Sequence, residues 1–200
     1  MEPILQAQFN QFKKSYAIDN VVSDLNDNIK ESKSFEYFIN HTLLSADYPD
    51  IFIGNFDLLD CISVGGGNDT GIDGVGIKIN GRLIGSTDDI DTIVEGCNKI
   101  NIEFVFIQAK MQDSIDSGEL TTFCQGVIHF LKDHPTLPEN EKIKHWRNMK
   151  DYLYSKEEFI VKWNENPTVK IYYATSSNND ASEHFTGIMN LYKQEMEKMY

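Results

Sequence analysis

The sequence has little positive charge. Its 18 Lys and Arg residues stand against 31 Asp and Glu residues, which gives a formal net charge of −13. Non-specific affinity for nucleic acid comes mainly from neutralising phosphates, so we expect this chain to bind DNA poorly by itself. Metal ions or another domain would have to supply the missing positive charge. Net charge does not determine the fold, and a local basic groove is compatible with it.

The sequence also lacks paired cysteines and long apolar runs. Its three cysteines, Cys61, Cys97 and Cys124, are widely spaced and form no C-x-x-C motif. This pattern indicates a reducing compartment and argues against a disulfide framework or a zinc site. No stretch approaches the length of a transmembrane helix, and the N-terminus does not resemble a signal peptide. We therefore expect a cytoplasmic protein with no membrane partner.

What is present suffices for one domain. Two hundred residues that are 40% hydrophobic and 12% aromatic can bury a sizeable core, but they are few for two domains. We predict N-terminal helices over residues 1–33, a core over 34–175 with a helical insertion at about 132–167, and a closing helix over 180–200.

Helical spacing of apolar residues dominates the N-terminal part. It predicts helices over residues 4–16 and 21–29, the second with Asp19 as a plausible N-cap. A third helix is predicted over residues 35–44, with Ser34 as its N-cap. The N-terminal part is therefore expected to pack as three helices.

The middle of the chain predicts strands. Residues 56–64 read as a strand, and residues 72–84 read as a hairpin whose turn is Asn80-Gly81. Residues 86–97 predict a short capped helix. The run 102–110 is apolar on both faces, which is typical of a central strand.

The C-terminal part predicts a helix, one or two charged helices, a strand and a final helix. These are expected over residues 120–131, 139–165, 168–175 and 182–200. Two histidines in this part, His129 and His134, have no ligand partner at i, i+4 spacing. We interpret them as surface or internally satisfied side chains.

Residues 65–110 contain the clearest chemical signal. The glycine-rich run Gly65 to Gly74 carries Asp73, and the central strand ends in Gln108-Ala109-Lys110. Side chains alternate along a strand, so Gln108 and Lys110 share one face. A lysine at the end of such an apolar strand is costly unless it has a partner, and Asp73 is the obvious candidate.

These residue types suit a magnesium site. Mg²⁺ prefers oxygen ligands and usually takes one or two carboxylates. Asp73, the side-chain oxygen of Gln108 and the backbone carbonyl of Ala109 could supply ligands. Lys110 could then orient a water or a phosphate oxygen during phosphodiester hydrolysis. The alternative is structural, because glycine-rich Asp turns are common and an isolated Q-x-K is not specific.

Other acidic residues have simpler interpretations. Glu36 falls in the first turn of the helix predicted from Ser34, where the helix dipole favours a carboxylate, so it is either a first-turn charge or a site residue. Asp88, Asp89 and Asp91 are interpreted as a solvated surface that favours an N-cap. The glycine run lacks the G-K-[ST] ending of a Walker loop, and EF-hand ligand spacing is absent.

The predicted order helix, strand, strand, strand, helix, strand resembles the PD-(D/E)XK nuclease core, in its Mrr-type branch with Q-x-K in place of E-x-K. More closely, the chain resembles the N-terminal region of the abortive-infection phage-resistance (AIPR) proteins. The matching stretches are Phe35-Glu36, Gly71 to Gly74, Phe106 to Lys110 and Ser117 to Glu119. The resemblance covers roughly residues 35–131 well and the remainder loosely.

The resemblance implies an α/β, restriction-endonuclease-like αβββαβ core with additional N-terminal, inserted and C-terminal helices. It makes Asp73 and Gln108 metal ligands and Lys110 the residue that positions water or phosphate. Glu36 corresponds to the acidic residue that completes the metal site in many of these nucleases. Gln125 lies where some relatives carry a glutamine motif, and this match is weak.

The implied function is a DNA endonuclease domain that requires Mg²⁺ or Mn²⁺ and acts in defence against phage. Family members continue well beyond this length, so the chain is expected to be the N-terminal part of a longer protein. The expected partner is nucleic acid, DNA before RNA, and a homodimer would suit double-strand cleavage. Two alternatives stay open: an inactive module with the nuclease fold that serves protein interaction or regulation, and an RNase that uses the same site.

Overall fold

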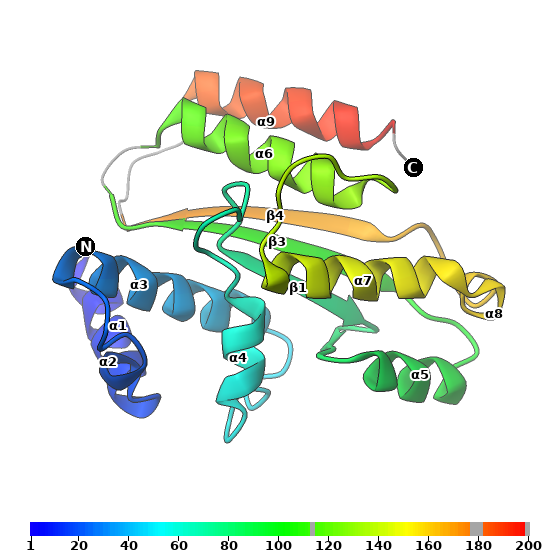
Figure 1. Ribbon diagram of the computed structural model, residues 1–200, viewed down its shortest axis with the longest axis horizontal. Helices are drawn as coiled ribbons and strands as arrows, with labels where there is room; N and C mark the ends of the chain where they lie inside the picture. Colours follow the sequence, from blue (N-terminus) through cyan, green and yellow to red (C-terminus); the bar gives the residue numbers. More distant parts are fainter. Residues whose placement is uncertain (113–114, 177–181, 199–200) are drawn as a thin grey trace.

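The protein is built on one mixed β-sheet with helices on both faces (Figure 1). The computed structural model describes residues 1–112, 115–176 and 182–198. In these residues the strands have the order β2-β1-β3-β4. Their bounds are Gly74–Ile79 for β1, Arg82–Leu83 for β2, Ile102–Lys110 for β3 and Thr168–Thr175 for β4.

The hairpin and the central strand confirm the sequence prediction. Asn80 and Gly81 have φ angles of 52° and 80°, the left-handed values that a two-residue turn between β1 and β2 requires. β1 pairs antiparallel with β3, with Gly74 opposite Ile107. β3 pairs parallel with β4 from Glu103 to Lys110 and is buried from Phe104 to Ala109. It is therefore the covered central strand that its apolar sequence predicted.

The helices divide between the two faces of the sheet (Figure 1). On one face, α6 and α9 lie together, and Phe130 of α6 packs edge-on against Phe106 of β3 with a ring centroid distance of 5.1 Å. On the other face, α3 packs against β3 and β1. The helix bounds are Pro3–Ser15 (α1), Ile18–Val21 (α2), Asp27–Leu44 (α3), Phe56–Ile62 (α4), Thr87–Gly96 (α5), Ser117–Leu131 (α6), Glu141–Ser155 (α7), Glu157–Ile160 (α8) and Glu183–Met196 (α9).

The strand predicted over residues 56–64 is wrong, because this segment forms helix α4. Asn55 caps the helix by accepting a hydrogen bond from the backbone N–H of Leu58. Leu59 and Ile62, three residues apart, are both fully buried. Helical spacing therefore buries both side chains on one face, whereas a strand would direct them to opposite faces.

Two predicted helix starts are also wrong. The helix predicted from Asp19 does not exist as such, because Asp19 lies inside the short α2. Helix α3 begins at Asp27, where Asn26 caps it by accepting from the N–H of Ile29. Ser34 lies within α3 and its hydroxyl donates to the carbonyl of Lys30. Glu36 is consequently in the interior of α3, and a first-turn dipole effect does not explain it.

Several other predictions are confirmed. Ser86 and Asp89 form a reciprocal capping box at the start of α5, and the predicted closing helix is present as α9, Glu183–Met196, while residues 180, 181, 199 and 200 of that prediction lie outside the described residues. His129 is buried and its Nε2 accepts a hydrogen bond of 2.7 Å from the N–H of Leu137, while His134 is exposed.

As a separate finding, none of the helices in the described ranges is both long enough and apolar enough to cross a membrane.

Candidate active site

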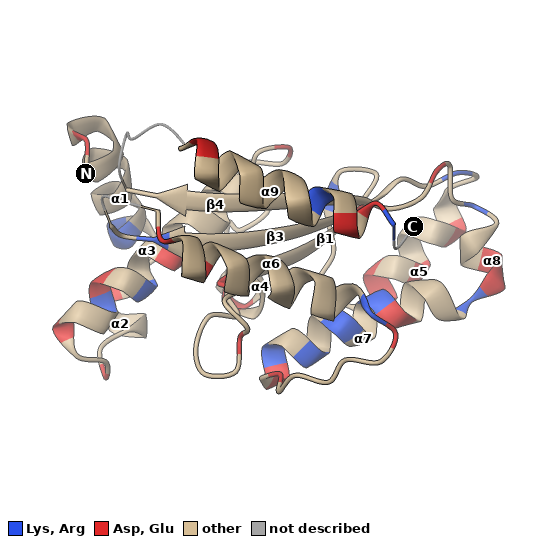
Figure 2. Cartoon of the chain, turned by 90° about the horizontal axis from the view of Figure 1, so that it is seen from above, with Lys and Arg blue, Asp and Glu red and all other residues tan. Residues whose placement is uncertain are grey.

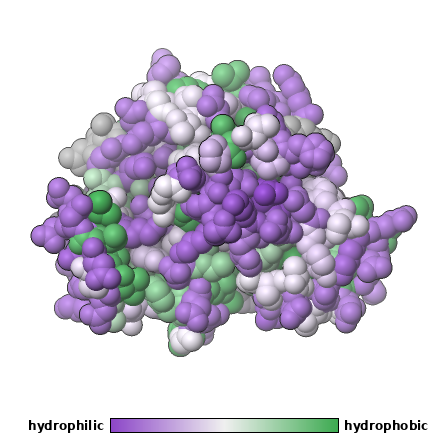
Figure 3. Space-filling view, viewed as in Figure 1, coloured by the Kyte–Doolittle hydropathy of each residue, from purple (hydrophilic) through white to green (hydrophobic). Residues whose placement is uncertain are grey.

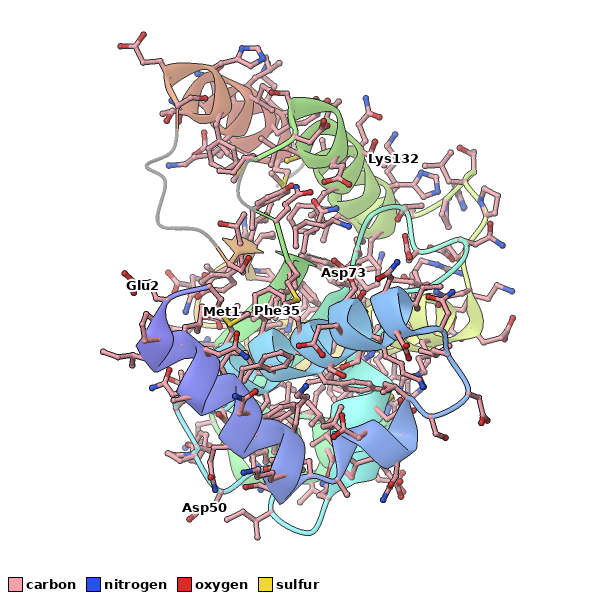
Figure 4. All side chains as sticks on the ribbon, turned by 90° about the vertical axis from the view of Figure 1, so that its left-hand side faces the viewer. Met1, Glu2, Phe35, Asp50, Asp73 and Lys132 are labelled. Carbon is pink, nitrogen blue, oxygen red and sulfur yellow. The ribbon has the colours of Figure 1, made fainter. Side chains whose placement is uncertain are left out.

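Asp73 stands immediately before β1 and is tied to the central strand at two points. Its N–H donates to the carbonyl of Ile107 at 2.8 Å, and its carboxylate Oδ2 accepts from the N–H of Ala109 at 2.9 Å. The β1–β3 pairing ends at Ile107. Beyond it, the Asp73 carboxylate accepts the hydrogen bond from the Ala109 N–H that a further backbone carbonyl of β1 would otherwise accept. Figure 4 shows Asp73 between α3 and α6. The strand register thus fixes the carboxylate at the end of β3.

Lys110 is the partner of Asp73, as the sequence predicted. Its Nζ lies 3.9 Å from Oδ2 of Asp73. This separation allows an ion pair but exceeds the length of a hydrogen bond. The Lys110 side chain is 27% exposed, whereas that of Asp73 is only 6% exposed. The ammonium therefore lies at the mouth of the site, where a bound anion could reach it.

A second carboxylate, that of Glu36, meets Asp73 at Gly65. A Cβ atom added at Gly65 would lie 2.6 Å from Oε2 of Glu36 and 3.0 Å from Oδ1 of Asp73. The two carboxylates thus border the same small space, which stays open only because residue 65 has no side chain. The structure brings together Glu36, Asp73 and Lys110, three residues that the sequence analysis assigned to one site.

Two residues of α3 that sequence reasoning missed complete the surroundings. Lys33 donates to Oε2 of Glu36 at 2.7 Å and to the carbonyl of Gly65 at 2.8 Å. Asn40 is fully buried and donates to the carbonyl of Asp73 at 3.1 Å. Both lie on the Glu36 face of the helix, at i−3 and i+4. That spacing was the available signal. Asn40 lies within the helix predicted over residues 35–44, whereas Lys33 joins the same face only because α3 begins before Ser34.

The two carboxylates resist ionisation. Burial and then the nearby charge of Glu36 raise the pKa of Asp73 to about 7, although Lys110 and the N–H of Ala109 oppose this. Burial also raises the pKa of Glu36, against the lowering effect of Lys33. A nearby cation stabilises the ionised form of two carboxylates that lie together in a desolvated space. Raised carboxylate pKa values of this kind are typical of metal sites and of acid–base sites.

Gln108 is almost fully buried on the same strand. Its Oε1 has no hydrogen-bond partner within the described part of the chain. A buried unpaired acceptor costs free energy, so such groups in native proteins call for a ligand, a water or an ion. The Gln108 amide lies close to Gly71, two residues before Asp73. The Gln108 atom near Gly71 is Nε2, 3.5 Å from a Cβ added there, so the role of Oε1 as a metal ligand stays a prediction.

The donor set suits a hard cation. The available groups are the carboxylates of Glu36 and Asp73, the amide oxygen of Gln108 and the Ala109 carbonyl, which projects from the same strand edge as the N–H bound by Asp73. No cluster of three His, Cys, Asp or Glu side chains arranged for a metal occurs among the described residues. A ligand set of two carboxylates and neutral oxygen atoms suits Mg²⁺, whereas Zn²⁺ prefers His and Cys ligands.

The glycine-rich loop is held in place from both sides. Asp69 accepts hydrogen bonds from the N–H groups of Gly66 and Gly71, which closes the loop on itself. Asn140, the N-cap of α7, donates to the carbonyl of Val64 at 2.9 Å. Gly126 of α6 abuts Thr70, so that any larger residue at position 126 would collide with it. The loop is therefore a packed wall of the site.

Other candidate residues lie apart from this site. Gln125 is exposed on α6, and no described contact links it to Asp73. Asp89 belongs to the α5 capping box and Asp91 accepts from the hydroxyl of Tyr152, as expected for residues with structural roles. Asp88 is exposed in the first turn of α5.

The surface charge is carried mainly by acidic residues, and the basic residues cluster on α7 (Figure 2). The middle of the face seen in Figure 3, over the start of α7, is hydrophilic. However, carboxylates neutralise the cations of α7. The pairs are Lys142 with Asp60, Lys144 with Glu141, Arg147 with Glu139 and Lys150 with Asp151, at 2.7–2.9 Å. α7 is therefore no ready-made phosphate-binding surface.

A scan against protein-family models, a search of curated proteins and a search of solved structures each found no match to this chain.

Proposed function

We propose that this chain is a Mg²⁺- or Mn²⁺-dependent phosphodiesterase, a DNA endonuclease domain of an anti-phage abortive-infection or restriction-type protein. One observation carries the proposal: the carboxylates of Glu36 and Asp73 border one glycine-lined space at the end of the strand that presents Gln108 and Lys110. Each carboxylate has a donor or a cation of its own, Lys33 for Glu36 and the Ala109 N–H with Lys110 for Asp73, yet the two acids still lie beside each other in a buried space, which favours a bound cation.

The order of elements supports the restriction-endonuclease-like interpretation. Helix α3, strands β1, β2 and β3, helix α6 and strand β4 occur in the order that the PD-(D/E)XK resemblance implies, with α1, α2, α4, α5, α7, α8 and α9 as additions. The resemblance to AIPR proteins supplies the defence role and the preference for DNA.

In the proposed mechanism, Asp73, Glu36 and the Gln108 oxygen would hold the cation, and the Ala109 carbonyl is a further oxygen donor. When bound, the ion would supply Lewis-acid stabilisation of the leaving oxygen and would lower the pKa of a water. Lys110 hydrogen-bonds the attacking water or a phosphate oxygen and offsets the charge that develops on phosphorus oxygens. Asn40 holds the backbone of Asp73 so that the carboxylate keeps its position on β3.

A non-catalytic interaction module is the rival function. The net charge of −13 and the neutralised cations of α7 favour it, because a phosphodiesterase must hold a polyanion. An RNase with the same site is a third candidate, which the choice of substrate separates from the DNA endonuclease.

Cleavage assays test the proposal. Supercoiled plasmid and single-stranded RNA are incubated with wild type, Asp73→Ala and Lys110→Ala, each with Mg²⁺, Mn²⁺ or EDTA. We expect metal-dependent cutting that disappears in both variants. Asp60→Asn is a matched control, since Asp60 is bound by Tyr37 and Lys142 and does not border the space between Glu36 and Asp73, and it should cut like wild type. If wild type cuts neither substrate, the interaction module becomes the better function.

Metal-dependent melting gives an independent readout. A ligand that binds only the folded state raises the melting temperature by mass action. Mg²⁺ or Mn²⁺ should raise the melting temperature of wild type, and the shift should vanish in Asp73→Ala. The absence of any shift in wild type would count against a metal site.

A further inference from the structure

Lys33 occupies one of the oxygens that the proposed metal would need. Its Nζ lies 2.7 Å from Oε2 of Glu36, the same oxygen that points toward Gly65 and hence toward Asp73. An ammonium and a divalent cation on one carboxylate oxygen repel each other strongly in a space that water hardly reaches. The two cations therefore exclude each other at this atom.

The Lys33–Glu36 pair differs from the other i, i+3 pairs of this chain. The side chains of Lys33 and Glu36 are 17% and 14% exposed, whereas in the Lys30–Asp27 pair the carboxylate is almost fully exposed. Lys33 also donates to the Gly65 carbonyl at 2.8 Å and lies 5.5 Å from the ring centre of Tyr37. Three contacts thus fix the ammonium inside the site, which an ordinary surface pair does not achieve.

We propose that Lys33 is a built-in competitor of the divalent cation for Glu36. The inference rests on the proposed function, because it assumes that Glu36 is a metal ligand. In the metal-free protein, Lys33 supplies the positive charge between the glutamate and the glycine loop. When the cation binds, Lys33 gives up Oε2 of Glu36 and keeps the Gly65 carbonyl as its anchor. Lys33 is a positioning residue, and its competition weakens the affinity for metal.

The structure offers a closely matched control, Lys13. Its Nζ lies 3.1 Å from Oε2 of Glu31, another residue of α3, and 4.9 Å from the ring centre of Phe9. Lys13 thus has the same two kinds of partner as Lys33, a glutamate of α3 and an aromatic ring. Glu31 has no contact with Asp73, so Lys13 tests the loss of a comparable ion pair outside the site.

The experiment is calorimetric titration of the whole chain with Mg²⁺ alone at pH 8.0, where protons compete least for the carboxylates. Lys33→Met should tighten the Kd for Mg²⁺ about five- to tenfold, the lower part of the usual range for coupled sites. Lys13→Met should leave this Kd within about twofold of wild type. In a Glu36→Gln background, Lys33→Met should give no tightening, because the contested oxygen has lost its charge.

The possible outcomes distinguish the competition by Lys33 from the proposed metal site itself. If wild type binds Mg²⁺ and Lys33→Met binds it equally or more weakly, the competition is overturned and the metal site stands. If no variant binds Mg²⁺, both are overturned. Thermal melting in EDTA checks that each variant is folded. Should Lys33→Met not fold, Lys33→Gln keeps a donor for the Gly65 carbonyl without the charge, and the same tightening is expected of it.

Discussion

Two carboxylate clusters meet at neighbouring positions of α3, and they are built in opposite ways. At position 37, the Tyr37 hydroxyl donates to Oδ1 of Asp60 at 2.5 Å, and Lys142 lies 2.9 Å from the same oxygen. At position 36, the Glu36 carboxylate faces that of Asp73 across Gly65. The first cluster places donors around one acid, whereas the second places two acids together.

The pKa values follow this difference. Burial by itself would raise the pKa of Asp60, but the hydrogen bonds from Tyr37 and Lys142 hold it below its ordinary value. The pKa of Asp73 is raised to about 7, by burial first and by Glu36 second. The Asp60 cluster therefore stabilises the folded protein. In the Asp73 cluster, ionising both acids costs free energy, and a bound cation would reduce that cost. This contrast separates a structural acid from a candidate functional acid.

The largest effect is expected from a substitution that fills the space between the Glu36 and Asp73 carboxylates. In Gly65→Ala, the new methyl group would press on the Glu36 and Asp73 carboxylates, and residue 65 does not need a positive φ, so the effect is steric. A displacement of about 1 Å at a reacting centre can cost on the order of 10²-fold in rate, which is the loss expected in plasmid cleavage. Gly67→Ala is the control, since no atom lies within 4 Å of its added Cβ. Equal activity of both variants would contradict the assigned site.

Neutralising one acid in each cluster should change stability in opposite directions. Asp73→Asn keeps an acceptor for the Ala109 N–H and removes a buried charge, so without metal it should stabilise the fold by about 1–2 kcal/mol, as relieved functional sites do. Asp60→Asn loses the ion pair with Lys142 and should destabilise by about 1 kcal/mol, a modest value because both side chains are two-fifths exposed. Urea unfolding in EDTA at pH 8 measures both. A loss of stability in Asp73→Asn would show that its charge is structural.

The stability of the two clusters should also depend on pH with opposite sign. The unfolded chain loses the Asp73 proton near the ordinary pKa of 3.8, whereas the folded chain holds it up to about 7. The contribution of Asp73 is therefore fully present below pH 3.8 and is lost as the pH rises toward 7. For Asp60, whose pKa is lowered, the contribution is present above its ordinary pKa and is lost as the pH falls.

Urea unfolding of wild type and Asp73→Asn from pH 4 to pH 8, both in EDTA, isolates this effect. The unfolding free energy of wild type should fall relative to that of the variant across the window. A difference that stays constant with pH would mean that the pKa of Asp73 is not raised.

The smallest expected effect concerns the hydroxyl that completes the structural cluster. Tyr37→Phe removes the hydrogen bond to Asp60 and should cost about 1 kcal/mol of unfolding free energy. Plasmid cleavage should stay within about twofold of wild type, because the Asp60 cluster is not part of the site. A large loss of cleavage would show that the two clusters are coupled through α3.

Much of this arrangement could be predicted from local sequence. The centre of β3, Phe104 to Ile107, is apolar on both faces, so its burial follows from composition. Asn80-Gly81 specifies its own turn, and Ser86 with Asp89 specifies a helix start. Asp73 and Lys110 were assigned to each other because a lysine at the end of a buried strand needs a partner. Each of these inferences needs only residues that are near in sequence or a strong burial requirement.

Predictions failed where local patterns were ambiguous. Residues 56–64 carry apolar side chains that suit either a strand or a helix, and packing of Leu59 and Ile62 against the rest of the core decides for α4. Ser34 is a good N-cap by type, but α3 already begins at Asp27 with Asn26 as its N-cap, and this moves Glu36 from a first turn to a helix interior. A short apolar run or a single serine does not contain the information that selects between these states.

The sequence alone determined the central strand, the hairpin and the chemical identity of Asp73, Gln108 and Lys110 as a candidate set. Only the tertiary structure placed Glu36 opposite Asp73, inserted the Lys33 ammonium beside it and assigned Gly65 the role of keeping the space between them open. The physical reason is distance along the chain. Strand patterns and turns depend on neighbouring residues, whereas the meeting of α3 with the glycine loop depends on how the helix packs against the sheet, which no local pattern specifies.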